Sequence, residues 1–232
     1  MAIKPANKIQ DLQYFGEYGG VNPSVSDSST FTFHSAKKMF DTFEGNADGC
    51  YLYARHTTPS SIYLGQALAA MEGTEAANVS ASGMGSITSV LMQLCTANDH
   101  VVSSRTIYGG TYAFLKNFAP KLNINTSFVD ITNLESVENA ITPKTTVLYC
   151  ESVSNPLLEV ADIPSLAKLA KKYNLKLVID NTFSPLSISP KELGADIVIH
   201  SLTKFINGSS DTVGGVVCGT HEMIDSLRSV ID

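Results

Sequence analysis

The stretch Asp196-Ile197-Val198-Ile199-His200-Ser201-Leu202-Thr203-Lys204 is an apolar, β-branched run that ends in hydroxyl side chains and a lysine. Such a run is typical of a strand that is buried on both faces of a parallel sheet. Ligands of open α/β sheets bind just beyond the carboxyl ends of these strands, so Lys204 would stand at a site, beside Ser201 and Thr203. An amine placed there can form a Schiff base with an aldehyde cofactor. The alternative is a solvated surface lysine, since most lysines are exposed.

Strand patterns of this kind alternate with helical patterns from about Pro59 onward. We expect strands at 78–81, 101–102, 127–129, 146–149, 177–179, 197–199 and 216–218. We expect helices at 60–72, 83–94, 111–118 (stopped near Pro120), 134–141, 164–173 and from about 221. This alternation predicts an α/β fold whose doubly wound, mostly parallel sheet of about seven strands is flanked by helices.

Residues 1–55 differ from the rest of the chain. They combine glycines, a Ser/Thr-rich run and several aromatic residues without a steady period. This pattern indicates an extended arm that lies over a neighbour and forms no core of its own. We therefore divide the chain into an arm, 1–55, and a large domain, 56–232.

Composition excludes several functional classes. A hydrophobic fraction of 44% indicates a globular core, and a net charge of −6 without a basic cluster argues against nucleic acid as a partner. No apolar run is long enough for a bilayer span, and the start of the chain lacks a secretory apolar region. The four cysteines and five histidines are scattered, so we expect reduced cysteines, a cytoplasmic protein and no metal site.

Residues 83–88, Gly83-Met84-Gly85-Ser86-Ile87-Thr88, begin like a dinucleotide-binding glycine motif. The sixth position is Thr88, no ribose-binding acid is obvious downstream, and no Walker A sequence is present. A Rossmann-type dehydrogenase is therefore disfavoured. The segment still lies between a strand and a helix, where free backbone N–H groups can hold a phosphate. A tight turn used only for close packing is the alternative.

Asp180 follows the apolar run 177–179, at the end of a strand expected to be buried. An unpaired carboxylate is costly there, so Asp180 needs a cationic partner. A protonated pyridine nitrogen is one such partner. A structural cap at the strand end is the alternative.

Several motifs occur in order along the chain and together supply a phosphate cradle, a ring-stacking aromatic, an acid and an amine. They are Tyr53-Ala54-Arg55, 68–73, Ser82-Gly83-Met84, 108–111, Glu151 with Asn155-Pro156, 178–182 and 200–204. With these motifs the chain resembles the Cys/Met-metabolism family of pyridoxal-phosphate enzymes. That family includes cystathionine γ-lyase, cystathionine γ-synthase, O-acetylhomoserine sulfhydrylase and methionine γ-lyase.

The resemblance implies a fold-type-I transferase-like domain, pyridoxal 5'-phosphate as the cofactor, and a role for each matching residue. Lys204 would form the Schiff base and move the substrate Cα proton, while Asp180 would keep the pyridine nitrogen protonated. Tyr108 would stack on the ring and assist acid–base steps, and Asn155 would touch the phenolic oxygen. The phosphate ligands implied are Gly83, Met84, Ser201 and Thr203. Tyr53 and Arg55 would reach the neighbouring subunit's phosphate, which implies a homo-oligomer, at least a dimer and usually a tetramer.

The sequence also departs from the family pattern. Thr58-Pro59-Ser60 stands where Asn-Pro-Thr is usual, and the run 207–211 lacks the histidine common there. Gly110 stands where dedicated methionine γ-lyases often carry cysteine. Members of the family continue into a smaller C-terminal domain with the arginine that binds the substrate carboxylate. We therefore expect this chain to hold the arm and the cofactor domain only.

The activity implied is carbon–sulfur bond cleavage by elimination on a sulfur amino acid, as in methionine γ-lyase or cystathionine γ-lyase. The close alternative is γ-replacement on a homoserine ester, as in cystathionine γ-synthase or O-acetylhomoserine sulfhydrylase. A hypothesis of another class is a truncated, non-catalytic fragment that binds the cofactor or a partner subunit.

Overall fold

The computed structural model describes residues 4–12, 19–47 and 49–231. The helices are α1 (Pro5–Asp11), α2 (Ala36–Phe43), α3 (Pro59–Glu72), α4 (Gly83–Leu94), α5 (Gly109–Ala113), α6 (Leu134–Asn139), α7 (Ile163–Lys172) and α8 (His221–Ile231). The strands are β1 (Ala76–Ser80), β2 (His100–Ser104), β3 (Asn125–Val129), β4 (Thr145–Glu151), β5 (Lys176–Asp180), β6 (Ile197–Ser201) and β7 (Gly215–Gly219). The strand and helix positions agree with those expected from the sequence to within a few residues at most ends.

The described strands form one seven-stranded sheet in the order β1-β7-β6-β5-β4-β2-β3. The pairs among β2, β3, β4, β5 and β6 are parallel, whereas β7 is antiparallel to both β1 and β6. The prediction of a mostly parallel sheet of about seven strands is confirmed. The exception has a local cause: residues 202–214 join β6 to β7 without a helix, and a parallel return needs a longer crossover.

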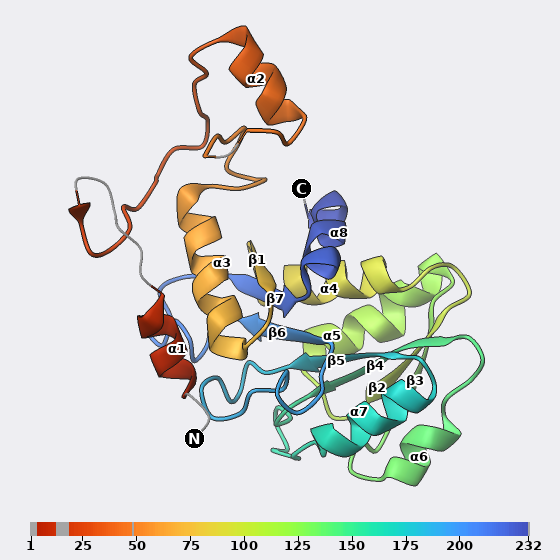
Figure 1. The fold of residues 1–232 in the computed structure, drawn as a ribbon. Coiled ribbons are helices and arrows are strands. Elements are labelled where there is room, and N and C mark those ends of the chain that lie inside the picture. The colour runs from red at the N-terminus through yellow and green to blue at the C-terminus, as the bar shows by residue number, and fades with distance from the viewer. Residues whose placement is uncertain (1–3, 13–18, 48, 232) are drawn as a thin grey trace.

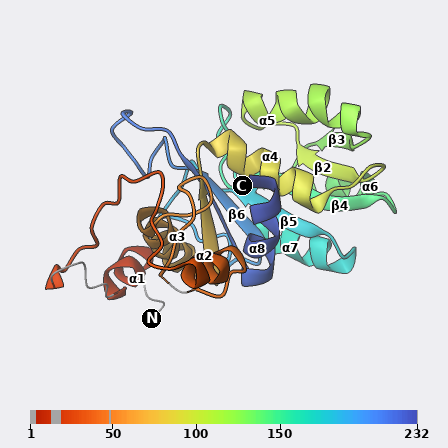
Figure 2. The ribbon, with the colours of Figure 1, turned by 90° about the horizontal axis from the view of Figure 1, so that it is seen from above.

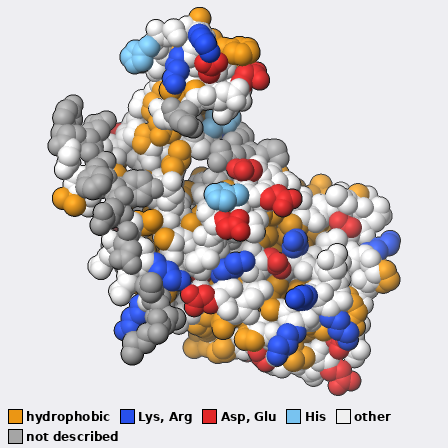
Figure 3. All heavy atoms as spheres, viewed as in Figure 1, with side chains coloured by type: hydrophobic (Ala, Val, Ile, Leu, Met, Phe, Trp, Pro, Cys, Tyr) orange, Lys and Arg blue, Asp and Glu red, His pale blue; other side chains and the backbone are white. Residues whose placement is uncertain are grey.

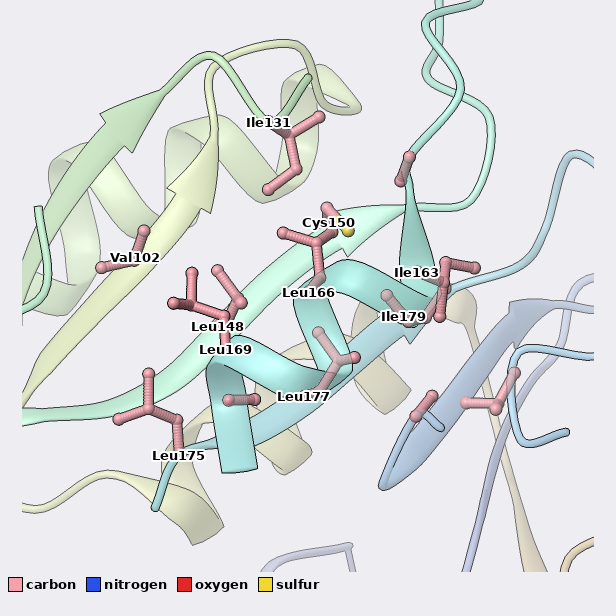
Figure 4. Packing of buried hydrophobic residues seen from close by; sticks show 14 of the residues in the cluster. Val102, Ile131, Leu148, Cys150, Ile163, Leu166, Leu169, Leu175, Leu177 and Ile179 are labelled. Carbon is pink, nitrogen blue, oxygen red and sulfur yellow. The ribbon is translucent and has the colours of Figure 1, made fainter. Parts of the chain in front are cut away.

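Helices cover both faces of the sheet, which gives three layers (Figures 1 and 2). We name the two faces of the sheet by their helices and not by the view in the figures: the front face carries α4, α8 and the helical segment 109–122, whose buried side chains include Ile87, Leu115 and Leu227. The rear face carries α3 and α7. Figure 4 shows α7 across β4 and β5, with Leu148 and Leu166 in the apolar layer between them.

Alternation along the central strands decides which side chains reach each face, because successive residues of a strand point to opposite sides. In β4, Val147 and Tyr149 pack at the front, whereas Leu148 and Cys150 pack at the rear. The same alternation continues past the strand ends. It sends Glu151, Asp180 and Ser201 to the front, and Ser152, Asn181 and His200 to the rear.

The segment after β2 differs from the expected helix at 111–118. It begins at Gly109, widens into a π-helical turn over Phe114–Phe118, and tightens into a 3-10 turn over Ala119–Leu122. Pro120 does not stop the helical path. It lies at the start of the 3-10 turn, where a residue needs no N–H and the fixed φ of proline fits.

Part of the predicted arm packs against its own domain. Helix α1 lies beside α3, Ile9 packs against the rear core, and Lys8 Nζ lies 2.7 Å from Glu192 Oε1. Helix α2 instead stands away from the sheet, near the top of Figure 1. The arm boundary at residue 55 and its role toward a neighbouring subunit stay predictions. In the part of the chain that is described, no helix is long and apolar enough to cross a membrane.

Candidate active site

A cavity of about 1110 Å³ opens at the carboxyl ends of β4, β5 and β6, beside the start of α4 and the loop after β2. Eight of the residues predicted to form the site line it: Gly83, Met84, Tyr108, Asn155, Asp180, Ser201, Thr203 and Lys204. Tyr53 and Arg55 do not line it. The guanidinium carbon of Arg55 lies 5.5 Å from the centre of the Tyr53 ring, within the arm.

The N-terminus of α4 forms an anion cradle. Ser82 caps the helix with extended backbone, and its Oγ accepts from Gly85 N at 3.0 Å. The N–H groups of Gly83 and Met84 lie in the first turn, where no intrahelical acceptor exists. A Cβ on Gly83 would lie 2.6 Å from Ser201 Cβ, so glycine is required for the close approach of α4 to β6. This helix start is suited to a phosphate.

The two hydroxyls near the cradle are held differently. Ser201 N donates to Thr182 Oγ1 at 2.7 Å, and the described residues offer no hydrogen bond to the Ser201 hydroxyl. Thr203 Oγ1 instead donates to Gly214 O (3.3 Å) and accepts from Gly214 N (3.1 Å). Ser201 is thus available to an anion, whereas Thr203 must give up its bond to Gly214 O before it can donate.

Asp180 is buried, with 6% of its surface exposed, and its carboxylate faces the cavity. Oδ1 accepts from Thr182 N at 2.9 Å, and Oδ2 lies 3.5 Å from the Tyr149 hydroxyl that donates to it. Burial raises the pKa of Asp180, and the Thr182 hydrogen bonds only partly offset this. Among the described residues it has no ion-pair partner. A cation in the cavity would stabilise its ionised form.

Lys204 follows β6 and lines the cavity. Its backbone is held in a turn, because Lys204 N donates to Ser201 O (3.3 Å) and Gly208 N donates to Lys204 O (2.8 Å). Its ammonium group forms no hydrogen bond or ion pair with any residue in 4–12, 19–47 or 49–231. The cavity is therefore lined by a primary amine that no described residue pairs with.

Tyr108 lines the cavity, and its ring lies close to Gly110. A Cβ on Gly110 would lie 2.6 Å from Tyr108 Cε1 and 3.0 Å from Met84 Sδ. The departure at Gly110 noted in the sequence therefore has a consequence. Any side chain at position 110 would displace the Tyr108 ring from this position.

Two residues at the site were given no role from the sequence. Glu151 ends β4, and its carboxylate accepts from the backbone N–H groups of Tyr108 (2.6 Å) and Asn155 (2.8 Å). Burial, together with the nearby Asp180, raises the pKa of Glu151 to about 7. Thr182 orients both Asp180 and Ser201. The argument applied to Asp180, a carboxylate at the end of a buried strand, would have singled out Glu151 as well.

The arrangement fits pyridoxal phosphate. The cradle at Gly83 and Met84 suits the phosphate, Asp180 suits a protonated pyridine nitrogen, Tyr108 offers an aromatic face, and Lys204 offers the amine. Within the described ranges, no three His, Cys, Asp or Glu side chains lie together as a metal site would require.

Comparison with known proteins gives the family. The family model described as "Cys/Met metabolism PLP-dependent enzyme" matches residues 7–231. The chain belongs to this family. Pyridoxal phosphate is accordingly its cofactor, and its fold is that of pyridoxal-phosphate-dependent enzymes. A structure of a putative O-acetylhomoserine (thiol)-lyase from Campylobacter jejuni, which carries N'-pyridoxyl-lysine-5'-monophosphate, has a TM-score of 0.88 at 28% identity, over 97% of this chain and 56% of that one.

Curated relatives within the Cys/Met-metabolism family have different activities. Methionine gamma-lyase from Arabidopsis thaliana is 46% identical over 97% of this chain and 53% of its own length. O-succinylhomoserine sulfhydrylase from Pseudomonas aeruginosa is 36% identical over 91% of this chain and 52% of its own length. The chain thus spans about half the length of these relatives. Family membership identifies an enzyme family and a cofactor, and it leaves lyase and sulfhydrylase activities both open.

Proposed function

We propose that the chain is the cofactor-binding part of a carbon–sulfur lyase that acts on a sulfur amino acid by elimination. The observation that carries this proposal is the meeting of an unpaired amine, a buried carboxylate and a helix N-terminus in one cavity. When bound, pyridoxal phosphate withdraws electrons from the substrate Cα and so makes its proton acidic.

The residues of the chain then have distinct tasks. Lys204 would hold the cofactor aldehyde through Nζ and, when that amine is free, would accept the substrate Cα proton at Nζ. Asp180 holds a proton on the pyridine nitrogen through its buried carboxylate. Tyr108 covers one ring face and assists acid–base steps. Asn155 would hold the phenolic oxygen, and the α4 cradle with Ser201 and Thr203 would hold the phosphate.

The lyase is favoured by the 46% identity to methionine gamma-lyase. The second candidate is γ-replacement on a homoserine ester, which the 36% identity to a sulfhydrylase supports and which uses the same cavity residues. Release of a 2-oxo acid from methionine or cystathionine without added thiol is expected for the lyase. A requirement for an activated homoserine ester plus a thiol would contradict it.

We also propose that the chain works as a homo-oligomer, at least a dimer and in the full assembly a tetramer. Apolar side chains of α2, Met39, Phe40 and Phe43, are 45–65% exposed, and Figure 3 shows hydrophobic side chains on this protrusion. Tyr53 and Arg55 lie outside their own cavity, as residues serving a neighbour would. Mixing Lys204→Ala and Arg55→Ala chains should restore cofactor binding at the one intact composite site.

We place the protein in the cytoplasm, because all four of its cysteines are free.

An alternative of another class is a non-catalytic fragment that binds pyridoxal phosphate or a partner subunit. The chain spans about half the length of the relatives that it matches. Turnover by this 232-residue chain at a rate close to that of a full-length relative would exclude it.

The first test is the visible absorption spectrum of the chain with added pyridoxal phosphate, beside Lys204→Ala. We expect a band that borohydride reduces in the parent, a cofactor mass fixed to the peptide containing Lys204, and neither in the variant. A reducible band of equal size in Lys204→Ala would exclude Lys204 as the cofactor-binding amine.

A further inference from the structure

Glu151 is one of the residues that line the cavity. It is the last residue of β4, its side chain points to the front, and only 7% of its surface is exposed. Across the sheet its register partner is Asp180 of β5. A buried carboxylate in this position needs hydrogen-bond donors to satisfy its two oxygens.

The donors come from two different loops. Oε1 accepts from Tyr108 N at 2.6 Å, and Oε2 accepts from Asn155 N at 2.8 Å. Tyr108 lies in the loop after β2, immediately before α5, whereas Asn155 lies in the loop after β4. One carboxylate thereby joins two loops, each of which contributes a side chain to the cavity lining. Because both oxygens are engaged by backbone donors, Glu151 is poorly placed to act as a general base.

The side chains of Tyr108 and Asn155 have few other constraints. The Tyr108 ring lies close to Gly110, but its hydroxyl has no hydrogen bond to the described residues, and Tyr108 is 46% exposed. Asn155 is exposed, and its amide has no partner in the same ranges. The backbone N–H groups held by Glu151 are therefore the fixed points from which these two side chains extend.

We propose that Glu151 is a positioning residue, which holds Tyr108 against the cofactor ring and Asn155 at the phenolic oxygen by accepting both backbone N–H groups. This inference rests on the proposed function. Glutamine has the same shape, but its NH₂ group would face one backbone N–H, so only one of the two bonds can remain. Aspartate keeps the charge and is too short to reach both donors.

The test compares Glu151→Gln and Glu151→Asp with the parent and with Glu159→Gln, a matched control. Glu159 follows the same strand, but its Oε1 lies 3.8 Å from Arg105 and away from the cavity. For each chain we would measure the affinity for pyridoxal phosphate, the visible circular dichroism of the bound cofactor and, without cofactor, the hydrogen exchange of the Tyr108 and Asn155 amides.

In both Glu151 variants we expect the borohydride-reducible band to form, the dissociation constant to rise about 10- to 100-fold, and the visible circular dichroism to fall severalfold. The control should match the parent. Unchanged affinity and dichroism in Glu151→Gln would overturn the inference. Recovery in Glu151→Asp alone would also overturn it, because charge and not position would then be the cause.

The parent chain offers a test that does not depend on a variant folding. In the cofactor-free parent, the Tyr108 and Asn155 amides should exchange at least about 10-fold more slowly than an unbonded loop amide. Free exchange at both would overturn the inference. Failure of the proposed function looks different, since the reducible band would then survive in Lys204→Ala whatever the behaviour of Glu151.

Discussion

The front and rear sides of the same three strand ends are built in opposite ways. At the front, Asp180 and Ser201 line a cavity in which the Ser201 hydroxyl and the Lys204 ammonium have no partner among the described residues. At the rear, their immediate neighbours in the chain, Asn181 and His200, are fully buried, and both contact Glu72 Oε1. Because strand side chains alternate, the two arrangements share one backbone. The rear contacts hold the strand ends, and the same strand ends present the Ser201 hydroxyl and Asp180 to the cavity at the front.

Asn181 is the centre of the rear contacts. Its Oδ1 accepts from Ser152 Oγ (2.7 Å) and Ser184 Oγ (2.8 Å), and its Nδ2 donates to Ile188 O (2.9 Å). A weaker contact of 3.3 Å joins Nδ2 to Glu72 Oε1. All four hydrogen-bonding positions of this buried amide are thus used, which orders the ends of β4 and β5.

Glu72 of α3 and His200 of β6 form the other rear contact, with Glu72 Oε1 2.7 Å from His200 Nε2. Both residues have at most 1% of their side-chain surface exposed. In the described part of the chain, Glu72 Oε2 and His200 Nδ1 have no partner. The pair joins α3 to the strand that leads to Lys204.

The largest expected effect is at this rear pair. His200→Ala leaves the Glu72 carboxyl group buried with only the weak Asn181 contact, so the free energy of unfolding should fall by about 3–5 kcal/mol. Urea unfolding of the cofactor-free chain measures it. As a control, Glu72→Leu/His200→Leu should lose less than the sum of the two single leucine variants. A loss below about 1 kcal/mol in His200→Ala would show that the pair contributes little.

At the front, Asp180→Asn should weaken cofactor binding without lowering the stability of the cofactor-free chain. The amide can still accept from Thr182 N, and the cost of burying a charge is removed, so the cofactor-free chain should unfold at the same or a higher urea concentration. Pyridoxal phosphate should bind at least about 30-fold more weakly, because a buried charge partner is lost. An absorption titration gives the dissociation constant. Lower stability with unchanged cofactor affinity in Asp180→Asn would show that Asp180 stabilises the fold and does not bind the cofactor.

The pH dependence of stability tests the front face again. The folded-state pKa of Glu151 is about 7 against an ordinary 4.5, so between these values the folded chain holds a proton that the unfolded chain releases. The contribution of Glu151 therefore makes the free energy of unfolding fall as pH rises from about 4.5 to about 7, by about 3 kcal/mol at most. The titratable neighbours are Asp180, Tyr149 and Cys150.

Cofactor-free parent and Glu151→Gln should be unfolded in urea at several pH values across this window. We expect the free-energy difference between the two chains to change with pH in the direction given. If the free energy of unfolding depended on pH in the same way in both chains, the raised pKa of Glu151 would be contradicted.

The smallest effects come from one substitution made on each face. Ser152→Ala at the rear should lower the free energy of unfolding by about 1 kcal/mol and leave cofactor affinity unchanged. Ser201→Ala at the front should leave stability unchanged and weaken cofactor binding by roughly 3- to 10-fold. The same measurements on both variants provide the matched control. If each substitution changed both the free energy of unfolding and the cofactor affinity to a similar extent, the two faces would not have distinct roles.

Much of the fold follows from local sequence. The apolar runs place the central strands, Ser82 and Asp162 mark helix starts at which their side chains accept from Gly85 N and Ser165 N, and the glycine after Glu72 ends α3. Hydrophobic period and capping are short-range properties, so a single chain segment suffices to read them. The helical segment 109–122 differs from the single helix predicted at 111–118, because its change of helical type depends on packing and not on hydrophobic period.

By itself, the sequence determined the strand–helix alternation, the family resemblance, and that Asp180, Ser201 and Lys204 follow the ends of buried strands. Only the tertiary structure decided the strand order, the antiparallel β7, the engagement of Thr203 by Gly214, and the contact of Glu151 with Tyr108, 43 residues away in the chain. The physical reason is range. Periodicity and capping act over a few residues, whereas these contacts form only when distant segments pack on one sheet.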